Sequence, residues 1–181
     1  RSRSRATIIK VGQLVGATDV VIGTYRVDGT TLSVTARSIR LDAGRLQPEV
    51  TERGELTELF GIFERLSGRL GRGGRPAGPA AAHPPLDAFE DYIKGLLATS
   101  PVSQASFLEA ALRDAPAFDR ARLALWEVRT EQADHAGALE TVRAVAPTSP
   151  RAFHAQFFAG ISLIELKRYD EALGVLRALQ E

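Results

Sequence analysis

The stretch His135-Ala-Gly-Ala-Leu139 is followed 34 positions later by the similar stretch Tyr169-Asp-Glu-Ala-Leu173, and the same interval separates Pro116 from Pro150. A fixed period of this length is typical of proteins built from stacked supersecondary units, in which each unit buries one face on its neighbour. We therefore expect residues 86–181 to form an all-α array of helix pairs.

The period and the apolar spacing together predict three helix pairs, over residues 86–118, 119–152 and 153–181. In the first pair, Asp87 is expected to cap the opening helix, and Ser100-Pro101 is expected to end it. This first pair is shorter than the other two, as terminal units of repeat arrays often are.

The last expected helix places Leu173, Leu176 and Leu179 on one face. A solenoid normally ends in a polar capping helix, because its outer face meets water. We therefore expect either that the natural array continues or that a partner covers this face.

The repeat resembles the tetratricopeptide repeat, a family of antiparallel helix pairs. In this resemblance Trp126 and Gly160 share the small-residue position of the first helix, while Ala138 and Ala172 share the tight position of the second. The resemblance implies a helical-hairpin solenoid, in which the first helices line a concave groove that takes an extended or helical peptide.

Transferred by register, the groove residues that the resemblance implies are Phe89, Tyr92, Arg120, Leu123, Glu127, Thr130, His154, Phe157, Ile161 and Ile164. Family members that clamp a terminal carboxylate need Lys and Asn here, whereas this chain has residues such as Leu123 and Phe157. The comparison excludes a carboxylate clamp and favours an apolar partner. Alternatively, the amino-terminal domain or the next helix fills the groove.

Residues 1–70 are expected to form a small α/β domain in the order helix, three antiparallel strands, helix. Thr7 is expected to cap the first helix, and Asp28-Gly29 is a strong hairpin signal. The third strand contains Pro48, which has no N–H to donate, so we expect it at a sheet edge. Gly54 is expected to end the sheet, and the second helix to begin at Glu55.

The second strand changes its alternation part of the way along. Leu32, Val34 and Ala36 are even-numbered, whereas Ile39 and Leu41 are odd-numbered. A bulge near Arg37–Ser38 would bring both sets to the same face, and we expect one there.

Residues 7–70 resemble the small α/β domain of curli-assembly lipoproteins and of the TolB amino-terminal region. The residues that carry the resemblance are the stretch Leu14-Val-Gly-Ala-Thr-Asp-Val-Val-Ile-Gly-Thr-Tyr25, then Leu41-Asp-Ala-Gly-Arg45, and Gly54 ahead of Leu59-Phe60. Members of that family open with an apolar strand that this chain lacks. We therefore expect the sheet to be completed by upstream sequence or by another chain, since an open edge is a liability.

Residues 71–85 are rich in Gly and Pro and have no apolar periodicity, which predicts a linker between domains. Its Arg-Gly-Gly could contact RNA and its Pro-rich end could dock on an aromatic groove, but a plain linker is the simpler interpretation. A phosphate-binding loop is excluded, because no Gly-Lys-Ser/Thr follows the glycines.

The composition narrows the function classes. The 181 residues include no Cys and three His, and the net charge is +1. Disulfides and thiolate metal sites are therefore excluded, and no basic face is dense enough to predict nucleic-acid binding. His83, His135 and His154 lack a neighbouring nucleophile or a carboxylate pair, so we expect no catalytic, cofactor or metal site. No apolar run is long enough to span a membrane.

We therefore expect an α+β chain that acts as a non-enzymatic bacterial adaptor, binding a protein partner through residues 86–181. A location in the periplasm or cell envelope is expected from the resemblance of residues 7–70, with the cytoplasm as the alternative. A homo-oligomer could form through the open sheet edge or through the last helix. The second hypothesis is a regulatory fragment of a larger signalling enzyme, because cyclases with TolB-like and tetratricopeptide domains occur.

Overall fold

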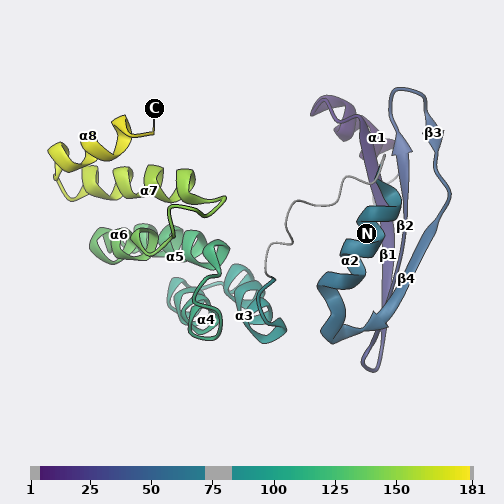
Figure 1. The fold of residues 1–181 in the computed structure, drawn as a ribbon, viewed down its shortest axis with the longest axis horizontal. Coiled ribbons are helices and arrows are strands. Elements are labelled where there is room, and N and C mark those ends of the chain that lie inside the picture. The colour runs from purple at the N-terminus through teal and green to yellow at the C-terminus, as the bar shows by residue number, and fades with distance from the viewer. Residues whose placement is uncertain (1–4, 72–82, 180–181) are drawn as a thin grey trace. The chain divides into compact units, whose positions relative to one another are not determined.

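The computed structural model describes residues 5–71 and 83–179, and it divides into two compact units, Arg1–His83 and Pro84–Glu181. The first unit contains an antiparallel four-stranded sheet and the second is a series of helices, which makes the chain α+β (Figure 1). The division lies inside the predicted linker, most of which, residues 72–82, lies outside the described part of the chain.

In the first unit, β2 (Thr31–Arg40) is the central strand. On one side β2 pairs with β1 (Asp19–Asp28), and on the other with β3 (Arg45–Leu46) and β4 (Val50–Glu55). The β1–β2 turn contains Gly29 at a φ of 59°, a left-handed conformation that glycine adopts without strain.

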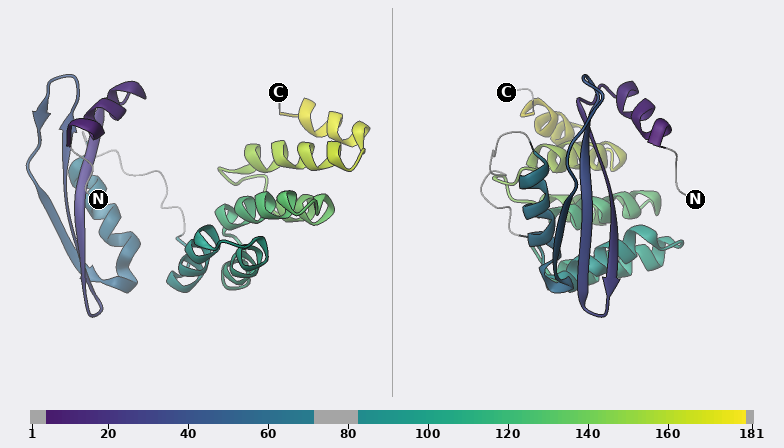
Figure 2. Two further views of the ribbon diagram at one scale, coloured as in Figure 1. Left: turned by 180° about the vertical axis from the view of Figure 1, so that it is seen from behind. Right: turned by 90° about the vertical axis from the view of Figure 1, so that its right-hand side faces the viewer.

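Helix α2 (Leu59–Leu70) follows a short 3-10 turn, η1 (Leu56–Glu58), and packs on β2 and β4 (Figure 2). The even-numbered residues of β2 face α2, because successive strand residues point to opposite faces. The resulting core consists of the buried side chains of Leu32, Val34, Ala36, Ile62 and Leu66.

Three local predictions for this unit are wrong. Helix α1 (Arg5–Leu14) contains Thr7 inside its first turns, so Thr7 does not cap it. Gly54 does not end the sheet, because β4 continues through it to Glu55 and Gly54 lies opposite Leu32. A Cβ at Gly54 would lie 3.3 Å from Cδ1 of Ile62, so α2 packs closely on β4 at this residue. The helix starts four residues later than expected, after η1.

The predicted bulge near Arg37–Ser38 is also wrong in its position. The register of β1 with β2 is unbroken, with Val21 opposite Ser38 and Val20 opposite Ile39. Both Ser38 and Ile39 are buried, and a Cβ at Gly12 of α1 would clash with Val20. Thus both faces are covered at this end of the sheet, which explains the change of parity in β2.

The extra residue lies instead on the facing segment. Ala36 pairs with Val50 and Ile39 pairs with Leu46, so two residues of β2 stand opposite the three residues 47–49. Pro48 is in the middle of this segment, while the N–H of Gln47 still donates to the carbonyl of Ser38 at 2.8 Å. The interruption separates β3 from β4, and Pro48 lies at an edge of the sheet, as the missing N–H predicted.

The second unit consists of six described helices. They are α3 (Leu86–Leu97), α4 (Pro101–Asp114), α5 (Asp119–Glu131), α6 (His135–Arg143), α7 (Ala152–Glu165) and α8 (Tyr169–Arg177). Each helix packs on the next, and α5 also contacts α7. Asp87 is the second residue of α3 and makes no capping hydrogen bond, contrary to the prediction, whereas the hydroxyl of Ser100 caps α4 by accepting from the N–H of Ser103.

Two hydrophobic clusters hold these helices together, and α5 contributes to both. The first cluster joins α3, α4 and α5 around Leu108 and Leu125, and the second joins α5 to α8 around Trp126 and Leu163. Trp126 stacks on Phe158 of α7 at 4.0 Å between ring centroids, and its indole N–H donates to the hydroxyl of Ser162 at 2.8 Å.

The turns α5–α6 and α7–α8 repeat each other atom for atom in their backbone hydrogen bonds. Ala133 and Lys167, which are 34 residues apart, have φ values of 59° and 60°, unusual for residues other than glycine. The N–H of Ala133 donates to the carbonyl of Thr130, and the N–H of Lys167 donates to that of Ile164. The sequence period is therefore also a period of the structure.

The small residues of the repeat have matching surroundings. A Cβ at Gly95 would lie 2.8 Å from Leu108, and a Cβ at Gly160 would lie 2.6 Å from Leu176. Ala138 and Ala172 are both almost completely buried. In each case a small side chain allows two neighbouring helices to approach closely.

Candidate functional site

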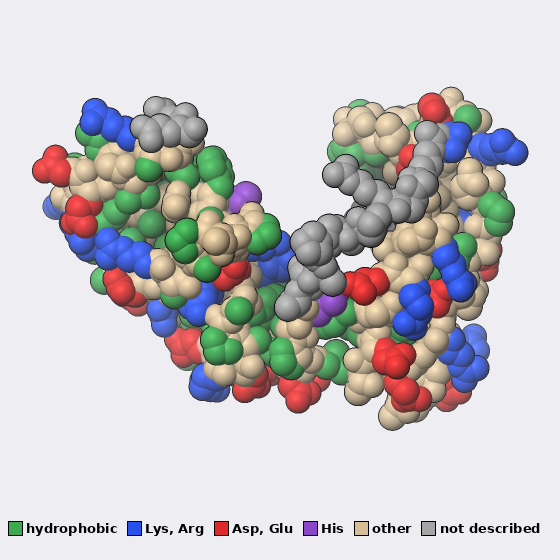
Figure 3. Space-filling view, viewed as in Figure 1, with side chains coloured by type: hydrophobic (Ala, Val, Ile, Leu, Met, Phe, Trp, Pro, Cys, Tyr) green, Lys and Arg blue, Asp and Glu red, His purple; other side chains and the backbone are tan. Residues whose placement is uncertain are grey.

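The predicted groove corresponds in part to a hollow of about 390 Å³ in the helical unit. Three helices, one from each helix pair, supply its lining. We call it the helical hollow, and it is lined by Tyr92, Leu96, Arg120, Leu123, Ala124, Glu127, Arg151, His154 and Phe158. In Figure 3, hydrophobic side chains reach the surface of this unit between charged ones.

The structure brings together half of the predicted groove residues in this hollow. The five that line it are Tyr92, Arg120, Leu123, Glu127 and His154. Three others are half-buried: Phe89 and Ile161 pack against the hydrophobic clusters, and Thr130 is part of α5. Phe157 and Ile164 are exposed on α7 but lie outside the hollow.

Four residues that line the hollow were not predicted, namely Leu96, Ala124, Arg151 and Phe158. Leu96 could have been predicted from the repeat. It follows Gly95 in the first unit as Glu127, a predicted groove residue, follows Trp126 in the second. Arg151 precedes α7 as its N-cap residue, so a helix register does not reach it. Phe158 resembles a core residue, since one face of its ring is covered by Trp126.

The hollow is not uniformly apolar, and this modifies the expectation of an apolar partner. Arg120 is the second residue of α5, Arg151 precedes α7, and His154 is the third residue of α7. The single acidic side chain among the lining residues is Glu127. The arginines therefore lie at one end of the lining, Leu123 and Phe158 form its apolar part, and Glu127 lies beyond them.

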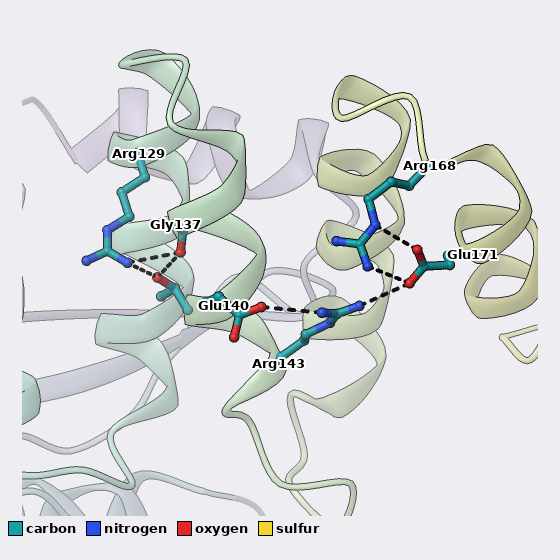
Figure 4. A network of polar contacts seen from close by, with 7 residues as sticks. Arg129, Gly137, Glu140, Arg143, Arg168 and Glu171 are labelled. Atoms are coloured by element: carbon teal, nitrogen blue, oxygen red, sulfur yellow. Dashed lines mark hydrogen bonds and ion pairs between the residues drawn. The ribbon is translucent and has the colours of Figure 1, made fainter.

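Several charged side chains elsewhere on the helical unit are paired with one another. Arg129 donates to the carbonyl of Gly137 at 2.9 Å and to Thr141 at 2.6 Å, which ties α5 to α6 (Figure 4). It also donates to Glu109 at 2.9 Å, which ties α5 to α4. These contacts use the hydrogen-bond donors of Arg129 within the protein, so we assign the network to the packing of the helices and not to a binding site.

A second set of ion pairs joins α6 to α8. Arg143 lies 3.3 Å from Glu140 and 3.6 Å from Glu171, and Arg168 donates two hydrogen bonds of 2.7 Å to Glu171 (Figure 4). The hydrogen bonds from Arg168, together with the charges of Arg168 and Arg143, hold the pKa of the Glu171 carboxyl below its ordinary value.

This lowered pKa predicts a pH dependence of stability. Because the folded state favours the Glu171 carboxylate, its contribution is present at neutral pH and is lost as the pH falls through the lowered pKa. Glu171→Gln should therefore destabilise the helical unit slightly at about pH 7 and should match the wild type in acid. Urea denaturation at both pH values measures the difference. Glu165→Gln, an exposed position on α7, is the control with the same change of charge, and an equal loss there would contradict the assignment.

The first unit contains a second hollow, of about 560 Å³, that was not predicted. Strands β1 and β2 and helix α2 form it, and we call it the sheet hollow. Its apolar lining consists of Val21, Tyr25, Val34, Ala36, Phe63, Leu66 and Leu70, and its other lining residues are Asp19, Gly23, Thr24, Ser38, Ser67 and Gly71. Helix α2 packs on β2 and β4 and leaves this face of β1 uncovered. Val21 is therefore exposed, and Tyr25 is 77% exposed.

Strand β1 is also an edge. Among the described strands, only β2 pairs with it. The N–H of Leu41 donates to the carbonyl of Thr18, so by the alternation of antiparallel bonds the odd-numbered residues of β1 direct their N–H and C=O groups away from β2. The expected homo-oligomer through this edge stays a prediction, as does one through α8, where Leu173 is exposed.

The three histidines have the following surroundings. His83 stacks on Phe60 at 4.5 Å and is hydrogen-bonded to Glu64 at 2.7 Å, His135 opens α6, and His154 lines the helical hollow. Asp134 caps α6 by accepting from the N–H of Gly137 at 2.9 Å, so its position beside His135 serves the helix start.

Residues 5–71 and 83–179 contain no group of three or more His, Cys, Asp or Glu side chains placed to hold a metal ion. None of the helices in these ranges has the length and apolar character needed to cross a membrane.

No protein-family model matches the chain, and comparison with curated proteins found no significant match.

Proposed function

We propose that this protein is a non-enzymatic adaptor, in which a tetratricopeptide-like array of helix pairs binds a segment of a protein partner. The segment would lie in the helical hollow, across α3, α5 and α7. The small α/β unit would be the curli/TolB-like domain of such an adaptor, with the sheet hollow as a second apolar surface.

The repeated geometry supports a tetratricopeptide-like array. The positive-φ residues Ala133 and Lys167 are one period apart, and Gly95 and Gly160 each face a leucine of the following helix. In repeat proteins such identical pairs stack in one direction and leave one surface for binding.

The observation that carries the functional proposal is that the helical hollow is lined by one helix from each of the three pairs. A surface of this kind exists only when the pairs stack, and it presents exposed or half-buried Leu96, Leu123 and Phe158 beside charged side chains. Grooves of this kind bind helical or extended segments through apolar anchors, with polar groups at the rim.

The proposal can be tested with peptides selected for binding to the full chain. A random peptide library displayed on phage should yield peptides that bind the wild type, and their dissociation constants should rise by at least about tenfold on Leu123→Asp, because a charge would replace the apolar floor of the hollow. Fluorescence anisotropy with labelled peptides gives these constants, and circular dichroism confirms the fold of each variant.

The matched control is Leu97→Asp, an exposed leucine at the end of α3 that does not line the helical hollow. It should leave the dissociation constants within about twofold. A selection that yields no binding peptide, or peptides that bind Leu123→Asp as well as the wild type, would rule out the helical hollow as the binding site.

A further inference from the structure

We infer that the segment bound in the helical hollow carries an acidic side chain beside its apolar ones, and that this side chain pairs with Arg120 and Arg151. This inference rests on the proposed function and specifies the partner's chemistry. It rests on two observations: which charged residues line the hollow, and which of them form ion pairs within the described residues.

The two arginines are available to a ligand. Within residues 5–71 and 83–179 neither Arg120 nor Arg151 forms an ion pair, whereas Arg129, Arg143 and Arg168 of the same unit do. Of the arginines of this unit without an ion pair, Arg120 and Arg151 are the two that line the helical hollow. Arg120 is exposed and Arg151 is half-buried, so both guanidinium groups can meet a ligand from solvent. Arginine pairs with carboxylates through two parallel N–H···O bonds, which gives such a contact both strength and direction.

Neither Asp119, at the start of α5, nor Glu127, which lines the hollow, forms an ion pair with these arginines within the described residues. The carboxylate of Asp119 accepts a hydrogen bond from the hydroxyl of Ser149, which joins the start of α5 to the turn before α7. Glu127 lines the hollow, but it is seven residues beyond Arg120 on α5, about 10 Å along a helix that rises 1.5 Å per residue.

The lining along α5 therefore has an order: Arg120 at one end, Leu123 and Ala124 in the middle, and Glu127 at the other end. The apolar middle is extended by Phe158, which is held in place by its stacking on Trp126. A complementary segment places an Asp or Glu over the arginines and a Leu or an aromatic residue over the middle. Its charge also sets the direction in which it lies, because the reverse orientation would bring its acid to Glu127.

The inference is tested by reversing the charge of the hollow and repeating the peptide selection. Against the wild-type chain, the selected peptides should be enriched in Asp or Glu next to Leu or an aromatic residue. Against the double variant Arg120→Glu/Arg151→Glu, the enrichment should change to Lys or Arg. An acidic peptide selected on the wild type should bind the double variant at least about tenfold more weakly, and increasing salt should weaken its binding to the wild type.

The matched control is Arg113→Glu/Arg177→Glu, which changes the net charge equally at two exposed arginines outside the helical hollow. This control should leave the affinity for acidic peptides within about twofold, because long-range effects of net charge are screened by salt. Equal losses in the two double variants would overturn the inference in favour of a general charge effect.

Failure of the inference is distinguishable from failure of the proposed function. If the selected peptides lose affinity on Leu123→Asp but not on Arg120→Glu/Arg151→Glu, the helical hollow remains the binding site and the acidic contact is wrong. A single-stranded oligonucleotide that binds at the arginines and is not displaced by acidic peptides would also overturn the inference. A selection that yields no peptide at all contradicts both proposals.

Discussion

Replacing Trp126 by alanine is expected to lower the free energy of unfolding of the helical unit by about 3–5 kcal/mol, the range for deleting a buried aromatic side chain. Trp126 is buried in α5, stacks on Phe158 of α7 and donates to Ser162 of α7. The substitution removes the ring from the cluster that joins α5 to α8 and also leaves the buried Ser162 without this hydrogen bond.

Urea denaturation followed by circular dichroism measures this loss, and hydrogen exchange resolved along the chain shows which unit it affects. Protection should decrease in residues 84–181 and remain unchanged in residues 5–71, because the two units have separate hydrophobic clusters. Trp126→Phe is the matched variant: it retains an aromatic ring beside Phe158 and should lose clearly less stability than alanine. A loss below about 1 kcal/mol on Trp126→Ala would show that stacking between the pairs does not depend on this contact.

Replacing Ile62 by alanine is expected to destabilise the first unit by about 2–5 kcal/mol. Ile62 is 0% exposed and lies at the centre of the contact between α2 and the sheet, beside Leu32, Val34 and Leu66. A cavity there cannot be filled easily, because Gly54 on the facing strand has no side chain to move into it.

The neighbouring residue Phe63 provides the control, since it is 49% exposed and faces the sheet hollow. Phe63→Ala should cost about 1 kcal/mol or less, because much of its ring already contacts water. Hydrogen exchange in residues 5–71 gives both values. A larger loss for Phe63 than for Ile62 would mean that the sheet hollow, rather than the α2–sheet contact, is the core of this unit.

The helices were predictable because their signals are local and periodic. The 34-residue interval relates Ala138 to Ala172 and Trp126 to Gly160, and Gly160 lies against Leu176 of the following helix. The turn residues Ala133 and Lys167 were not predictable in the same way. Neither is the glycine that a positive φ favours, so their conformation is imposed by the packing of the helices on either side.

The antiparallel order of the strands was predictable, but three strands were expected, whereas the third is divided at Pro48 into β3 and β4 and the sheet has four. The change of parity after Ala36 is a real feature of the sequence, yet it has two physical explanations. A bulge in β2 would produce it, and so would burial on both faces of a regular strand. Only the pairing of Val20 with Ile39, and the packing of α1 on Val20, shows that the second explanation holds.

Residues of the candidate site were predictable from the sequence only where they lie within an expected helix. Register placed Arg120, Leu123 and Glu127 of α5 in the helical hollow, because residues three or four apart share a helix face. It did not reach Arg151, which precedes α7 and comes to the hollow through the turn that Ser149 and Asp119 stabilise. The basic end of the hollow is therefore a product of the tertiary structure.

The sequence by itself determined that this protein is an α/β domain followed by repeated helix pairs, because strand alternation and helix periodicity are written in residues close together in the chain. The tertiary structure alone decided which surfaces remain uncovered. Helix α2 packs on β2 and β4, which leaves Tyr25 of β1 exposed, and the stacking of three helix pairs assembles Arg120 and Arg151 around one hollow. Both outcomes depend on contacts between segments far apart in the chain, which no local pattern encodes.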